Sequence, residues 1–149
     1  MERRRSPAEE IASCTCLRLR KATRRVTQIY DEMLAPAGVT IAQFSLLAHL
    51  MEGRDLSVGE LAEGLVTDPT TLTRNLKPLL DRALVEISAD LEDRRRRLIR
   101  LTPAGRQSVV TAHPLWRKAQ TRVATLLGES DTARLNKALD HSLKRLIDN

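Results

Sequence analysis

Apolar residues recur every three or four positions along most of this chain, a spacing typical of amphipathic helices. The first stripe follows a capping box at residues 6–9, with proline at the first helical position, and stops at Pro36. The pattern predicts one helix of roughly 28 residues, against a usual length of about 11–12. Its apolar stripe comprises Ala12, Cys16, Leu19, Ala22, Val26, Ile29 and Met33. Because one compact domain cannot cover so long a helix, we expect it to pack against a partner subunit.

Three shorter helical segments follow, and each begins with a recognisable capping residue. The first opens with the capping box of Thr40 and Gln43, and the second with that of Ser57 and Glu60. Asp68 can cap the third, whose first helical residue is a proline. Two helices, a turn and another helix are therefore predicted in the middle of the chain.

From Leu84 onward the apolar period changes to two, which is the period of a β-strand. Val85 and Ile87 precede a charged segment, and Ile99 and Leu101 follow it. Two short strands on either side of a charged tip predict a β-hairpin.

Two more helices complete the chain, the first capped by Thr102 and Pro103 and ended by Gly128. The predicted fold class is mainly α with a small β-hairpin wing, since a hairpin directly after a helix-turn-helix is the order of a winged helix-turn-helix. The predicted organisation is a disordered basic tail at 1–5, an N-terminal dimerisation helix at 6–36, a winged helix-turn-helix DNA-binding lobe at 40–102, and C-terminal dimerisation helices at 103–149.

Composition narrows the class of partner. The 149 residues suit one domain, and a net charge of +6 favours a polyanion such as nucleic acid or an anionic membrane surface. Two cysteines are too few for a disulfide framework, which favours a reducing compartment. No apolar run approaches about 18 residues and no signal-peptide pattern opens the chain, so we expect a cytoplasmic protein without a membrane partner.

The segment 68–83 has the pattern of a recognition helix, with its leucines on one side and polar residues on the other. Recognition helices read bases chiefly with their N-terminal residues. Thr70, Thr71 and Arg74 can hydrogen-bond base edges, contact a thymine methyl or grip a guanine. The alternative is an ordinary solvated helix face. The candidate DNA-binding residues in and before this helix are Ser57, Thr70, Thr71, Thr73, Arg74, Asn75 and Lys77.

The predicted hairpin tip carries four consecutive arginines, which repel one another and add nothing to a stable fold. We expect them to lie against the DNA backbone, with one reaching into a narrow minor groove. Asp93 stands two residues before Arg95, a spacing that suits a wing-structuring role rather than repulsion of phosphate. The alternative is a solubilising loop. The candidate DNA contacts of the wing are Arg94, Arg95, Arg96 and Arg97.

At this point the sequence resembles the MarR family of bacterial transcription regulators over nearly its whole length. The matching segments are CLRLRKATRRVTQIYDEMLAPAGVTIAQFSLLAHL, LSVGELAEGL, DPTTLTRNLKPLLDRALV, DLEDRRRRLIRLTPAGR and HPLWRKAQ. The resemblance implies a homodimer with interlocked terminal helices that grips a pseudo-palindromic operator on double-stranded DNA. It also implies a repressor released by a small ligand or by thiol oxidation. Ala83 departs from the glycine usual in the family, and Pro69 from a frequent basic residue.

The repressor could sense its signal in one of two ways, by thiol oxidation or by binding a small molecule. Cys16 falls where the organic-hydroperoxide-sensing branch of the family has its reactive cysteine, with Arg18 nearby. Ile41 and Phe44, however, stand where that branch supplies tyrosine hydroxyls, and Cys16 can equally be a buried packing residue. A small-molecule effector of unknown identity could instead occupy a cavity, although each of its candidate residues is equally explained by packing. The residues of this sensor or pocket are Cys16, Leu19, Arg20, Tyr30 and Trp116.

Other classes of protein fit the sequence less well. No Gly-rich phosphate loop, nucleophile elbow or metal-ligand spacing appears, so neither an enzyme nor a bound cofactor or metal is expected. Cys14 and Cys16 would lie about 200° apart on one helix, which argues against joint metal ligation or a disulfide. The alternative hypothesis is a winged-helix protein-interaction module without DNA binding. Such a module would not need an arginine-tipped wing.

Overall fold

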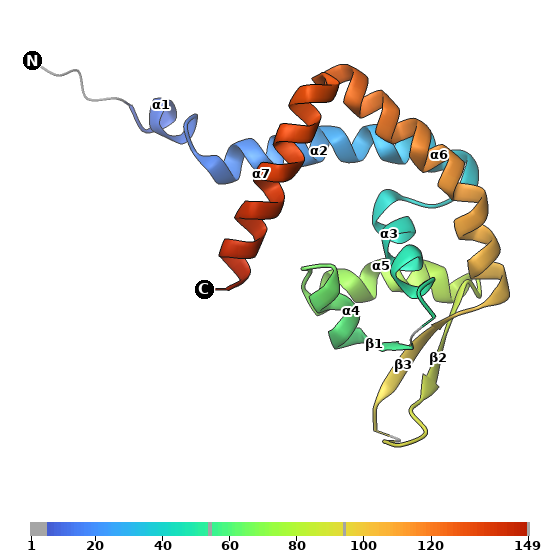
Figure 1. Cartoon of the computed structure of the whole chain (residues 1–149). Coiled ribbons are helices and arrows are strands. Elements are labelled where there is room, and N and C mark those ends of the chain that lie inside the picture. Colours follow the sequence, from blue (N-terminus) through green and yellow to red (C-terminus); the bar gives the residue numbers. More distant parts are fainter. Residues whose placement is uncertain (1–5, 54, 94, 149) are drawn as a thin grey trace, which may run out of the picture.

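The computed structural model describes residues 6–53, 55–93 and 95–148, and its elements follow the predicted order (Figure 1). The tail predicted at 1–5 and the predicted DNA contact Arg94 lie outside the described residues. Helices dominate the fold, with a small antiparallel sheet in the middle of the chain.

The single long N-terminal helix was a wrong prediction, because the chain forms α1 (Pro7–Ile11) and then α2 (Thr15–Leu34). The helix breaks where the Ser13 hydroxyl donates to the Glu10 carbonyl at 2.7 Å, competing with the helical hydrogen bonds. Cys14 then takes an extended conformation, with ψ at 122°, and caps α2. The predicted capping box of Ser6 and Glu9 is confirmed at the start of α1.

A short connection turns the chain from α2 into the winged lobe. The 3-10 helix η1 (Ala35–Ala37) ends at Gly38, whose φ of +69° favours glycine. The helix α3 (Ile41–Leu50) then begins at the predicted capping box of Thr40 and Gln43. An Asp31 carboxylate oxygen accepts the Ile41 backbone N–H at 2.7 Å, which ties the start of α3 back to α2.

The winged lobe contains the predicted helix-turn-helix and hairpin. The helices α4 (Val58–Gly64) and α5 (Pro69–Asp81) are capped as expected by Ser57 and Asp68. The strands β2 (Val85–Ala89) and β3 (Arg97–Leu101) form the hairpin.

The sheet contains a third strand that the sequence pattern did not predict, β1 (Leu56–Ser57), which pairs with β3 to give the order β1-β3-β2. Leu56 lies opposite Ile99, and Ser57 opposite Leu98. A strand of two residues has no readable period, and its partner lies far along the chain.

One hydrophobic core holds the lobe together. The leucines of α3 and α5 meet Val85 and Ile99 of the sheet and Val109 and Ala112 of α6. The side chains that are buried almost completely are Leu34, Leu46, Leu47, Leu61, Leu72, Leu79, Val85 and Ile99. Burying branched aliphatic side chains of this kind contributes about 1.5–3 kcal/mol each. The core therefore fixes which face of α5 points outward.

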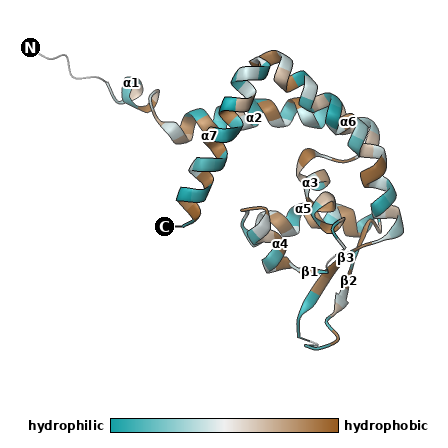
Figure 2. Ribbon diagram, in the orientation of Figure 1, coloured by the Kyte–Doolittle hydropathy of each residue, from teal (hydrophilic) through white to brown (hydrophobic). Residues whose placement is uncertain are grey.

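The long helix α6 (Pro103–Leu127) leaves the lobe and packs along α2, where Tyr30, Ala119 and Val123 form a second buried cluster. The last helix, α7 (Glu129–Ile147), stands apart from the winged lobe in Figure 1 and has no buried residue. Figure 2 shows apolar positions recurring along α7. The exposed large apolar residues of α6 and α7 are Val110, Leu126, Leu127, Leu135, Leu143, Leu146 and Ile147.

Among the described residues, no single helix is long and apolar enough to cross a membrane. The segments Thr15–Ala37 and Ile41–Leu50 reach that length and composition only together, across a bend of 69°. Much of the second segment belongs to the lobe's buried core.

Candidate nucleic-acid interface

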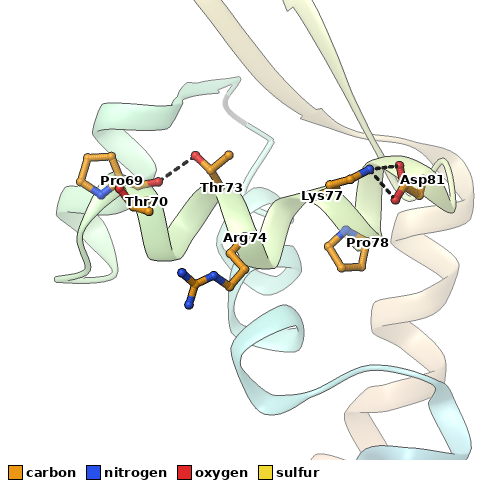
Figure 3. A pocket seen from close by; sticks show the side chains of 7 residues that line it. All are labelled: Pro69, Thr70, Thr73, Arg74, Lys77, Pro78 and Asp81. Atoms are coloured by element: carbon orange, nitrogen blue, oxygen red, sulfur yellow. Dashed lines mark hydrogen bonds and ion pairs between the residues drawn. The ribbon is translucent and has the colours of Figure 1, made fainter.

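The outer face of α5 is a shallow open groove, lined by residues spaced three and four apart. Its residues are Pro69, Thr70, Thr73, Arg74, Lys77, Pro78 and Asp81 (Figure 3). They are all exposed, because Leu72, Leu76 and Leu79 hold the opposite side of the helix in the core. The face predicted from the leucine spacing is therefore the face that solvent reaches.

Several of the predicted base-reading side chains already have partners within the helix. The Thr71 hydroxyl donates to an Asp68 carboxylate oxygen at 2.6 Å, and the Thr73 hydroxyl to the Pro69 carbonyl at 2.7 Å. The Asn75 side-chain amide donates to the Thr71 carbonyl at 3.2 Å, and Thr71 and Asn75 are half-buried. These bonds organise the start of α5. The hydrogen bonds from Thr71 lower the pKa of Asp68 and favour its charged form at the cap.

Lys77 is also paired, since its Nζ lies 3.0 Å from an Asp81 carboxylate oxygen. Both side chains are largely exposed, so water and salt weaken this pair. The side chains of Thr70 and Arg74 form no hydrogen bond with any described residue, and Arg74 extends away from the helix in Figure 3. The side chains of Thr70 and Arg74 can therefore bind a ligand without first breaking a hydrogen bond to a described residue.

The wing tip is organised by Asp93, as its spacing to Arg95 predicts. The Asp93 carboxylate accepts the Arg95 backbone N–H at 3.0 Å, and its carbonyl accepts the Arg96 N–H at 2.8 Å. The Arg96 carbonyl in turn accepts the Asp90 N–H at 2.9 Å. Figure 2 shows hydrophilic residues gathered around this tip.

The arginines of the wing are not equivalent. Arg95 and Arg97 are exposed, and neither side chain pairs with another described residue. The Arg96 guanidinium instead bonds Glu60 of α4 and lies 3.6 Å from an Asp90 carboxylate oxygen. Farther along β3, Arg100 makes a two-pronged ion pair with Asp55 at 2.5 and 3.1 Å, which lowers the pKa of Asp55.

Ser57 occupies a structural position as well as a predicted DNA-binding one. It ends β1 and caps α4, and its hydroxyl donates to a Glu60 carboxylate oxygen at 2.8 Å. The Ser57 backbone N–H and the Arg96 guanidinium also hydrogen-bond Glu60. These hydrogen bonds lower the pKa of Glu60 from 4.5 to about 2. The Ser57 backbone N–H has the largest effect, followed by the Arg96 guanidinium and then the Ser57 hydroxyl. The carboxylate is therefore charged at any physiological pH.

The five predicted sensor or pocket residues do not come together in one chain. Tyr30 and Trp116 share a cluster at the junction of α2 and α6, whereas Cys16, Leu19 and Arg20 are exposed on the N-terminal half of α2. Cys16 and Tyr30 are roughly 20 Å apart along the helix, at its rise of about 1.5 Å per residue. The five residues therefore do not line one cavity within a single chain, and a shared sensor or pocket stays a prediction.

The junction cluster includes groups that the sequence did not single out for this place. The Tyr30 hydroxyl donates to Gln120, and burial raises the pKa of Tyr30. Trp116 stacks on Phe44, with ring centroids 6.1 Å apart, and on His113 at 5.7 Å. No local pattern joins these residues, because they come from three different helices.

The two cysteines also lie differently from their predicted positions on one helix. Cys14 precedes α2 and is half-buried, while Cys16 is exposed on its first turn. Because Cys14 lies outside α2, the two cysteines are not related by the predicted angle of about 200° on one helix. Within the described ranges, no group of His, Cys, Asp and Glu side chains is arranged to hold a metal ion.

Comparison with known proteins places this arrangement in a family. Residues 37–96 match the model of the MarR family, and this range includes α3, the helix-turn-helix and most of the hairpin. The structure of the M. tuberculosis transcriptional regulator MosR in complex with DNA is 36% identical, with a TM-score of 0.70. That match covers 87% of this chain and 98% of MosR. The chain belongs to the MarR family.

Two further proteins are similar to this chain. The transcriptional repressor NicR of Pseudomonas putida is 33% identical over 87 residues, which are 58% of this chain and 55% of NicR. The match thus spans about half the length of that curated relative. BpsR of Bordetella bronchiseptica, whose DNA binding is regulated by 6-hydroxynicotinic acid, is 25% identical with a TM-score of 0.77. That match covers 93% of this chain and 96% of BpsR. NicR and MosR are transcriptional regulators and not enzymes.

Proposed function

We propose that this MarR-family chain is a homodimeric, sequence-specific DNA-binding repressor that acts in the cytoplasm. The observation that carries the proposal is the outer face of α5, where Thr70 and Arg74 are exposed and have no partner among the described residues. Both lie in the N-terminal half of the helix, the part of a recognition helix that contacts bases. The DNA-bound relative MosR supports the same conclusion.

In the proposed complex, α5 enters the major groove and the wing follows the neighbouring backbone. The Arg74 guanidinium suits the two acceptors of a guanine edge, and Thr70 suits a phosphate or a thymine methyl. Arg95 stands at the tip of the wing with its side chain exposed, where it can reach a minor groove or a phosphate. Ser57, Thr71, Thr73, Asn75, Lys77 and Arg97 remain proposed contacts of the same surface.

Dimerisation follows from apolar surface that one chain cannot cover. The 19 residues of α7 include none that is buried, although apolar side chains recur along one side of the helix. An amphipathic helix of this length is stabilised mainly by packing its apolar face, so we assign that face to a second copy of the chain. A dimer would present two winged lobes to a pseudo-palindromic operator.

Release by a small ligand is the proposed mode of regulation. The regulation of BpsR by 6-hydroxynicotinic acid supports a ligand-released repressor. The cluster around Tyr30 and Trp116 joins α2 and α6 to the lobe through Phe44. Binding beside this cluster would therefore act where the dimerisation helices meet the DNA-binding lobe, and Cys16, Leu19 and Arg20 could contribute only from a partner subunit.

Thiol-based sensing by Cys16 is the second candidate for the signal, favoured by the exposure of that cysteine in the single chain. An oxidant would then weaken DNA binding by the wild type and not by Cys16→Ser. If the two proteins lose DNA affinity equally on treatment with peroxide, Cys16 is not the sensor.

The proposed function is tested by titrating purified protein against the DNA upstream of its own gene at two salt concentrations, with an unrelated duplex as control. Tight binding that prefers the upstream DNA and weakens steeply with salt is expected, because neutralised phosphates release counterions. The rival interaction module without DNA binding would bind both duplexes weakly and with little salt dependence.

A further inference from the structure

The Glu60 side chain joins the start of α4 to the tip of the wing. On the α4 side, one carboxylate oxygen accepts both the backbone N–H and the hydroxyl of Ser57 at 2.8 Å. On the wing side, the other oxygen accepts a hydrogen bond from the Arg96 guanidinium. One carboxylate therefore bridges two elements that lie far apart in the sequence.

Backbone pairing with β1 does not reach the tip of the wing. β1 pairs with β3 only through Leu56 and Ser57, so the strand partner ends opposite Leu98. Beyond that point the tip consists of β2, β3 and their turn. Among the described residues, the Arg96–Glu60 pair is the side-chain hydrogen bond that connects this tip to the helix-turn-helix.

Arg96 is held at both its ends. Its backbone N–H and carbonyl take part in the hydrogen bonds of the tip with Asp93 and Asp90. Its guanidinium lies between the carboxylates of Glu60 and Asp90, which compensate its charge. A cation already compensated by carboxylates neutralises little phosphate charge and so releases few of the counterions condensed on DNA, whereas Arg95 has no carboxylate partner among the described residues.

We propose that Arg96 is a positioning residue of the wing and not a DNA contact, and that Glu60 is the group on α4 that holds it. The proposal rests on the proposed DNA-binding function and corrects the role that the sequence suggested for Arg96. In this arrangement α4 sets the angle at which the wing presents Arg95 to DNA.

Replacing Glu60 with glutamine separates the two roles of Arg96, because they predict opposite results. Glutamine also serves at this position of a capping box, so α4 keeps its start. If Arg96 positions the wing, Glu60→Gln weakens binding of a mixed-sequence duplex by about two- to fivefold, the range expected for an exposed ion pair. If Arg96 is a DNA contact, the same substitution frees its charge and tightens binding, which overturns the proposal.

A double-mutant cycle and a matched arginine control complete the test. Arg96→Gln should weaken binding about as much as Glu60→Gln, and the double variant no more than either, because the two residues act as one unit. Arg96→Lys should restore part of the affinity. Arg95→Gln, the control, should flatten the salt dependence by about one unit, whereas Arg96→Gln should leave that slope unchanged. Equal flattening by both variants would count against a positioning role.

Hydrogen exchange in the free protein tests the pair without DNA. The Asp90 and Arg96 amides should exchange faster in Glu60→Gln than in the wild type. Unaltered exchange at both amides would overturn the proposal even if DNA binding is weakened. If the wild type shows no salt-dependent DNA binding while exchange changes as expected, the proposed function fails and the Arg96–Glu60 connection stands.

Discussion

The hydroxyl of Thr102 donates to the carbonyl of Ala83 at 2.7 Å, across the corner where α5, the sheet and α6 meet. The same oxygen accepts the Gly105 backbone N–H at 3.0 Å, so one side chain caps α6 and anchors it to the end of the recognition helix. This relationship explains the Leu-Thr-Pro-Ala-Gly segment of the sequence. It also fixes α6, and α7 beyond it, relative to α5.

Gly105→Ala should destabilise the fold. A Cβ at Gly105 would lie 1.9 Å from the Leu84 carbonyl oxygen, a backbone atom that cannot move alone. Overpacking of this kind typically costs about 1–3 kcal/mol, and chemical denaturation would measure the loss. Gly59→Ala is the matched control, since its Cβ would meet nothing closer than 3.9 Å. Similar losses in both variants would rule out steric crowding as the cause.

Ala83→Gly should stabilise the protein. Ala83 has a φ of +52°, in the left-handed region where an L-residue costs about 1–2 kcal/mol and glycine does not. We expect a gain of about 1 kcal/mol in the free energy of unfolding. Ala104→Gly, an exposed position in the first turn of α6, should lose stability instead. A loss at position 83 as well would show that no strain is relieved there.

Arg74→Ala should cost about 1–3 kcal/mol of binding free energy on the operator and relax base preference at one position of each half-site. Its side chain has no competing described partner, so the lost affinity reports contacts with DNA. Affinity measurements on an operator series with single base changes would check this. Arg74→Lys, the control, keeps the charge but loses the two-pronged geometry, so it should retain affinity better than specificity. Unchanged affinity in Arg74→Ala would remove Arg74 from the interface.

Protonation of Glu60 at low pH should remove the stabilisation that its charged form contributes. Because the pKa of Glu60 is lowered from 4.5 to about 2, the stabilisation from Glu60 is present above pH 4.5 and lost as the pH falls toward 2. An NMR titration of the Glu60 carboxyl carbon should therefore have its midpoint near 2. In Arg96→Gln the midpoint should rise but stay below 4.5, because Ser57 still donates to the carboxylate. Arg100→Gln, whose arginine pairs with Asp55, should leave the Glu60 midpoint unchanged.

Leu143→Glu should convert the proposed dimer to monomers. Leu143 is 45% exposed in the single chain and lies on the apolar side of α7, so a dimer interface there would bury the new charge. Light scattering after gel filtration would measure the mass. Lys137→Glu places the same side chain on the polar side of α7 and should leave the dimer intact. A dimeric Leu143→Glu variant would place the interface elsewhere.

The sequence alone determined the order of the elements and the face of the recognition helix. Capping boxes are local, since a side chain at one position satisfies the backbone three residues away. Those at Thr40 and Ser57 therefore marked real helix starts. The leucine spacing of α5 was equally reliable, because the helical period alone decides which side chains share a face. Ala83 stands where the resemblance implied a glycine, and its φ of +52° gives the physical reason for that preference.

Tertiary structure decided which of the predicted contacts are available. Four adjacent arginines look alike in the sequence, yet Arg96 is paired because β1 brings α4 and Glu60 beside the hairpin. Tyr30 and Trp116 meet, while Cys16 lies far along α2, because α6 packs against only part of that helix. The break at Ser13 likewise depends on a side chain competing for a backbone carbonyl. The first two outcomes depend on residues distant in sequence, about which local patterns carry no information, and the third depends on which of two local hydrogen bonds prevails.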